Sequence, residues 1–201
     1  MRPALLAALV VAVVVLSGCE GSVPAPGDAK VDVDTPALRE LRQSADIEDC
    51  QDGAGAPVDG GLPDVTLPCL GGGSDVDVAS LRGPLVVNLW ASWCGPCRKE
   101  MPIYQRFHER YGDRVGVLGI DFKDTQPAAA LELAQQTGAT YPLLADPQTA
   151  LEGTDTFPTL PGLPWVILVD SEGSVVYKAP GEIDSEGQLV DLVDKHLGTE
   201  L

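Results

Sequence analysis

The chain has 201 residues, with 13 basic and 30 acidic side chains and a formal net charge of −17. Its apolar fraction of 44% is that of a globular protein. The sequence has neither a basic cluster nor basic residues interleaved with aromatic ones, so it does not indicate a nucleic-acid-binding protein. Once a leader and a linker are subtracted, the length suits one domain with a sizeable core.

The N-terminal segment has the pattern of an export signal. Arg2 precedes an uninterrupted apolar run of 13 residues at 4–16, which is too short to span a bilayer but suits the core of a signal peptide. Two small residues and then Cys19 follow, an arrangement that resembles the bacterial lipobox. That resemblance implies a lipoprotein signal peptide at 1–18, lipidation of Cys19 and an extracytoplasmic protein anchored to the cell membrane. An ordinary secretory leader is the alternative.

The next segments predict a linker and a small extension. Residues 19–35 are rich in glycine, proline and alanine, and we interpret them as a flexible tether. Thr35, followed by proline, predicts the cap and first position of a short helix in an N-terminal extension at 36–57. Alternating residues at 62–67 and 76–78 predict a small hairpin.

From residue 58 onward the chain alternates between apolar runs, which predict buried strands, and periodic stretches, which predict helices. The expected strands lie at 84–90, 114–122, 165–169 and 174–178, and the expected helices at 98–111, at 126–137 and from Ser185. This order predicts an α/β domain at 58–201 whose mixed central sheet is flanked by helices on both faces.

Five cysteines are present, and disulfides persist outside the cytoplasm. Cys94 and Cys97 lie at a strand-to-helix junction, where a helix N-terminus lowers the pKa of a thiol. We expect Cys94 to attack disulfides and Cys97 to resolve the mixed disulfide. Cys50 and Cys69 are left over and could form a structural disulfide worth about 3 kcal/mol, if the geometry permits. Their spacing does not suit zinc, and we expect neither a metal nor a cofactor.

The motif Trp-Cys-Gly-Pro-Cys at 93–97 resembles the redox site of thioredoxin. Residues 85–102, 117–124 and 162–170 are similar to the membrane-anchored TlpA/ResA/CcmG (DsbE) branch of the thioredoxin-like proteins. The resemblance covers about residues 60–198 and implies a thioredoxin-like fold.

The resemblance also assigns roles around the two cysteines. It makes Pro164 a cis-proline opposite Cys94, with backbone groups before it that bind an extended substrate. Asn88 stands where thioredoxin has a buried aspartate, and the resemblance implies Asp124 as the acid that exchanges a proton with Cys97. The expected substrate-binding residues are Trp93, Gly95, Pro96, Leu163, Pro164 and Trp165.

The resemblance implies a thiol-disulfide oxidoreductase that exchanges disulfides with exported proteins. Its expected partners are those clients and a membrane thiol protein that donates or accepts electrons, with no nucleic acid. The dipeptide at 95–96 is that of reducing thioredoxins, which favours a reductant, and the branch suggests service in cytochrome c maturation. Two alternatives stay open: an oxidase that introduces disulfides, and a non-catalytic lipoprotein that binds clients.

Overall fold

The computed structural model describes residues 30–201, so the expected signal peptide and Cys19 lie outside the described residues. Between residues 30 and 201, no helix is long and apolar enough to cross a bilayer. The elements follow one another as α1 (Pro36–Ser44), β1 (Thr66–Leu67), β2 (Val76–Asp77), the 3-10 turn η1 (Val78–Ser80), β3 (Leu85–Trp90), α2 (Gly95–Tyr111), β4 (Gly116–Phe122), α3 (Pro127–Thr137), β5 (Leu143–Asp146), β6 (Trp165–Val169), β7 (Val175–Pro180) and α4 (Glu186–Leu197).

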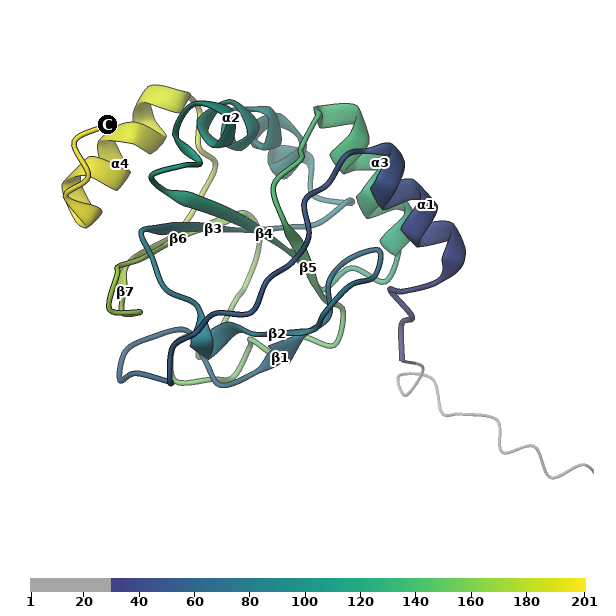
Figure 1. Ribbon diagram of the computed structural model, residues 1–201, viewed down its shortest axis with the longest axis horizontal. Helices are drawn as coiled ribbons and strands as arrows, with labels where there is room; N and C mark the ends of the chain where they lie inside the picture. The colour runs from purple at the N-terminus through teal and green to yellow at the C-terminus, as the bar shows by residue number, and fades with distance from the viewer. Residues whose placement is uncertain (1–29) are drawn as a thin grey trace, which may run out of the picture. The chain divides into compact units, whose positions relative to one another are not determined.

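A five-stranded sheet with the order β5-β4-β3-β6-β7 forms the centre of the fold (Figure 1). Strands β3, β4 and β5 are parallel, whereas β6 and β7 are antiparallel to their neighbours. The expected mixed sheet of a thioredoxin-like fold is therefore confirmed. Strands β1 and β2 pair antiparallel as the small hairpin that the alternating pattern predicted, but with only two residues each.

The helices are placed differently from the expectation of cover on both faces. Side chains from all four α-helices join one apolar cluster, which meets the sheet at Val86 and Trp90 of β3. Figure 1 shows α1 to α4 on the same side of the sheet. The reason is topological: β3-α2-β4 and β4-α3-β5 are successive parallel crossovers that advance in the same direction, and right-handed crossovers of that kind put both helices on one face.

The opposite face of the sheet is covered without an α-helix among the described residues. Val87 and Leu89 of β3 pack there against the β1–β2 hairpin, η1 and the loop at 147–163. Phe157 and Leu160 bring that loop into the second cluster. Consequently β3 is buried on both faces, as its continuous apolar sequence predicts.

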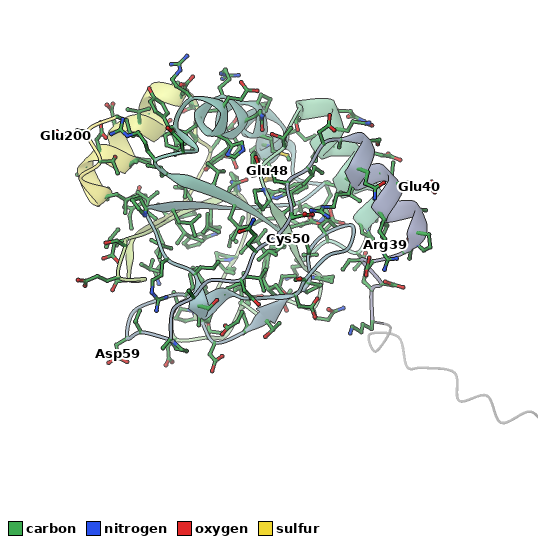
Figure 2. The ribbon with its side chains drawn as sticks, viewed as in Figure 1. Arg39, Glu40, Glu48, Cys50, Asp59 and Glu200 are labelled. Carbon is green, nitrogen blue, oxygen red and sulfur yellow. A yellow bond between two sulfur atoms is a disulfide. The ribbon has the colours of Figure 1, made fainter. Side chains whose placement is uncertain are left out.

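The segment at 68–70, together with the N-terminal extension that is linked to it, covers the outer edge of the sheet at β5. The Sγ atoms of Cys50 and Cys69 are 1.97 Å apart in a disulfide, and Cys69 bridges to Leu144 of β5. The amide of Glu48 donates to the carbonyl of Thr140, and Figure 2 shows Glu48 and Cys50 on the segment that leads away from α1. This covering leaves little free backbone at the β5 edge.

Candidate redox site

The junction between β3 and α2 brings the two closely spaced cysteines together. Strand β3 ends at Trp90, and Cys94 is the N-cap residue of α2. The Cys94 Sγ atom accepts a hydrogen bond from the Cys97 amide at 3.2 Å, and the two sulfur atoms form a disulfide of 1.92 Å. Pro96 occupies the first turn, where its missing N–H has no cost in hydrogen bonding. The same helix end that binds the disulfide sulfur would stabilise a thiolate.

The two sulfurs differ in how far solvent reaches them. The Cys94 residue is 4% exposed and Cys97 is fully buried, while the neighbouring Trp93 is 53% exposed. Gly95 and Pro96 are exposed as well. A client can therefore reach Cys94 more readily than Cys97, and the expected order of attack stays a prediction.

Asp124 is buried behind the turn that carries the cysteines. Its Oδ2 accepts from the Ser92 amide at 2.7 Å and its Oδ1 from the Gln126 amide at 2.9 Å. The Ser92 carbonyl in turn accepts from the guanidinium of Arg98 at 2.7 Å. These contacts make Asp124 a positioning residue for the turn before Cys94, and its expected exchange of a proton with Cys97 stays a prediction.

Asp121 forms a buried carboxyl pair with Asp124. Burial raises the pKa of Asp121 well above its usual range, and the negative charge of Asp124 and a hydrogen bond to it act in the same direction. Burial and the acidic neighbour therefore both favour the protonated form of Asp121. Sequence pattern alone does not identify Asp121, since its burial depends on the packing of β4.

Glu100 is a buried acid that sequence reasoning did not assign to the site. Its Oε1 accepts from Asn88 Nδ2 at 2.7 Å and its Oε2 from the Ile183 amide at 3.0 Å. Burial raises the pKa of Glu100 to about 7, against the opposing effect of those two hydrogen bonds. Glu100 lies three residues after Cys97 on α2, so the two are neighbours on one helix face. That spacing is the signal that could have identified it.

The segment before β6 supplies the second wall of the site. The Leu163–Pro164 peptide bond is cis, and Trp165 pairs with Leu89 near the end of β3 that leads to the cysteines. Trp165 is partly buried, and its Nε1 donates to the Gly162 carbonyl at 2.8 Å. A second cis bond precedes Pro84, at the other end of β3, and was not expected from the sequence.

A cavity of about 310 Å³ joins the two walls. Trp93 lines one side and Leu163 another, so the side chains flanking the redox motif and the cis-proline meet there. A larger cavity of about 380 Å³ lies beside Cys50 and Leu85, where β3 begins, and is not lined by Cys94 or Cys97. Neither cavity is lined by Cys94 or Cys97, but the smaller one is lined by Trp93, the residue next to Cys94.

The chain is similar to known redox proteins over most of the described residues. A family model described as the AhpC/TSA family matches residues 58–178. The chain is 31% identical to the thiol-disulfide oxidoreductase ResA of Bacillus cereus, over 57% of this chain and 65% of that protein. It is 36% identical to the thiol:disulfide interchange protein DsbE of Allochromatium vinosum, over 64% of this chain and 70% of that protein. The chain thus spans about two thirds of the length of these curated relatives.

Solved structures agree with the sequence matches. A secreted thiol-disulfide isomerase from Corynebacterium glutamicum is 25% identical and superposes with a TM-score of 0.57. The match covers 66% of this chain and 85% of that structure.

Proposed function

The chain belongs to the AhpC/TSA family, with relatives named thiol-disulfide oxidoreductases, and from this premise we propose that it exchanges disulfides with exported proteins through Cys94 and Cys97. The observation that carries the proposal is the position of Cys94 as the cap of α2, with its sulfur bound by the Cys97 amide. A helix N-terminus favours the thiolate, which is the form that attacks a disulfide.

In the reducing direction, the exchange proceeds in two steps, and each step breaks one disulfide bond as it forms another. The Cys94 thiolate attacks one sulfur of a client disulfide, so that a Cys94–client bond forms, the client's own disulfide breaks and one client thiolate leaves. Cys97 then loses its proton and attacks Cys94 Sγ, which forms the Cys94–Cys97 disulfide and releases the second client thiolate. Two electrons pass to the client, and the reverse sequence oxidises it.

The proton of Cys97 needs an acceptor inside the protein, because Cys97 is fully buried. Glu100 is the acceptor that we propose. It lies one helical turn further along α2, and its pKa of about 7 suits proton transfer near neutral pH. Asn88, which donates to the Glu100 carboxylate, orients it. Asp124 would act on the turn that holds Cys94 through its hydrogen bond to Ser92.

Two features away from the redox pair support a location outside the cytoplasm. The Cys50–Cys69 disulfide is buried and stands apart from the redox pair, as a structural disulfide does in an oxidising environment. The apolar run at 4–16 and Cys19 support export and a lipid anchor. The direction of electron flow that we favour is reduction of clients, in line with the Gly95–Pro96 dipeptide and with a role in cytochrome c maturation.

A trapping experiment tests the proposal. In Cys97→Ser, the mixed disulfide between Cys94 and a client has no internal thiol to resolve it, so adducts should accumulate in cells and mass spectrometry should identify them. The matched control is Cys94→Ser/Cys97→Ser, which should trap nothing. If Cys97→Ser gives no adducts that dithiothreitol releases, and the wild type shows no thiol exchange, only a client-binding role without catalysis survives.

A further inference from the structure

The smaller cavity lies between the redox motif and the loop before the cis-proline. Trp93, Phe122, Leu160, Pro161 and Leu163 give it an apolar lining. Lys123 also borders it, and this residue is exposed. The cavity therefore combines an apolar floor with a cation at its rim.

Lys123 is free to bind a client carboxylate. Within residues 30–201, no carboxylate lies within 4.0 Å of its amino group. The nearest acidic neighbour in sequence, Asp124, has both of its oxygens engaged by the amides of Ser92 and Gln126. In a chain with a net charge of −17, Lys123 supplies a positive charge beside the redox pair.

The backbone fixes Lys123 at this place. Its φ is 58°, the left-handed region in which glycine or asparagine is the usual residue. The conformation lets its carbonyl accept from Trp93 Nε1 at 3.3 Å and its amide donate to the Asp146 carbonyl at 3.0 Å. The backbone of Lys123 is thus held, in a conformation that disfavours a lysine, against the indole next to Cys94.

We propose that this cavity selects client segments in which an apolar side chain and a carboxylate lie close to the attacked cysteine. The apolar side chain would enter between Trp93 and Leu163, and the carboxylate would meet Lys123. The inference rests on the proposed disulfide exchange and adds a substrate preference to it. Lys123 is then a specificity-determining residue that takes no part in the exchange of sulfur bonds.

Peptide disulfides test the preference. Three short peptides, blocked at both ends, would each contain one cysteine and one leucine, together with glutamate, glutamine or lysine, and each cysteine would be joined to 2-mercaptoethanol. The reaction of the reduced protein is quenched with acid and followed by chromatography. Near physiological ionic strength, where charges more than about 8 Å away are screened, the net charge of the chain contributes little.

The reduced wild-type protein should react with the glutamate peptide about threefold faster than with the lysine peptide. Lys123→Met should abolish the difference, and Lys123→Glu should reverse it. The matched control is Lys195→Glu, an equal charge change on α4, which should keep the wild-type preference. Replacing the leucine of the glutamate peptide by serine should slow the wild-type reaction.

Equal rates for the glutamate and lysine peptides, or a preference that survives Lys123→Glu, would overturn the inference. The uncharged disulfide of 2-mercaptoethanol, which has no peptide side chains, tells a wrong substrate preference apart from an absence of disulfide exchange. If the reduced protein reacts with that small disulfide but does not discriminate between the peptides, disulfide exchange stands and the substrate preference is wrong. If it reacts with neither, both are wrong.

Discussion

Glu100 combines full burial with hydrogen bonds to both of its carboxylate oxygens. Those bonds come from Asn88 and from the backbone of Ile183, so the carboxyl group is held between β3 and the segment before α4. Because burial still dominates, the folded protein holds a proton on Glu100 that the unfolded chain releases. A buried acid of this kind links the protonation of the site to the stability of the fold.

The Glu100→Gln variant tests how the proton on Glu100 changes the free energy of unfolding with pH. Below pH 4.5 the carboxyl group is protonated in both states, and between 4.5 and about 7 only the folded state keeps the proton. The free energy of unfolding of the wild type should therefore fall through this window by about 3 kcal/mol more than that of the variant. Urea titrations of both oxidised proteins across the window measure the difference.

The pH dependence of exchange gives a second readout for the same variant. If Glu100 accepts the proton of Cys97, the wild-type rate should have an inflection near pH 7 that Glu100→Gln lacks. If the wild type and Glu100→Gln lose stability in parallel across this pH window and have the same pH dependence of exchange rate, Glu100 neither titrates there nor accepts the proton of Cys97.

At the scale of elements, the contact between β4 and its neighbours leaves no room for a side chain at Gly119. A Cβ atom there would lie 2.5 Å from Leu143 Cδ2, 2.9 Å from Trp90 Nε1 and 3.1 Å from Tyr141 Cε2. The glycine thus lets β3, β4 and β5 pack closely under α2.

Gly119→Ala should lower the free energy of unfolding by about 1–3 kcal/mol, because the core must shift to admit the methyl group. Gly187→Ala in α4 is the matched control, since nothing lies within 4 Å of its Cβ position. The control should leave stability unchanged or raise it by about 0.4–1 kcal/mol. Chemical denaturation of both variants measures the change, and an unaffected Gly119→Ala protein would refute this packing.

The sequence predicted elements best where local pattern and tertiary context agree. The apolar run at 165–169 is β6 to the residue, and Ser185 caps α4 through its hydroxyl group. Strand β5 (Leu143–Asp146) was missed, because three apolar residues before an aspartate become a strand only through pairing with β4. The role of Glu100 was missed for a related reason: its burial depends on how α2 packs, which periodicity alone does not fix.

At the scale of the whole molecule, the two disulfides belong to different parts of the fold. Cys94–Cys97 lies at the carboxyl end of the central strand, beside the exposed Trp93. Cys50–Cys69 is buried at the β5 edge and joins the N-terminal extension to the sheet. Burial does not separate the two pairs, since Cys94 is 4% and Cys50 7% exposed. The position of Cys94 at the N-terminus of α2, which favours a thiolate, does separate them, so we expect the first pair to exchange with cellular thiols and the second to stay oxidised.

Alkylation in living cells can determine the direction of electron flow. If the protein is a reductant, rapid trapping with a thiol reagent followed by peptide mapping should find Cys94 and Cys97 mostly reduced. Cys50 and Cys69 in the same sample should be disulfide-bonded and serve as the internal control. A redox pair that is mostly oxidised would instead identify the protein as an oxidase of exported proteins.

The Cys50–Cys69 link also has a mechanical consequence. Tension applied at residue 31 would first unravel residues 31–49, whose full extension releases about 65 Å of chain. The covalent bond at Cys50 would then carry the load into the β5 edge and stop the unravelling there. The central strand and the cysteines at its end would stay folded while the N-terminal extension lengthens the reach of the domain.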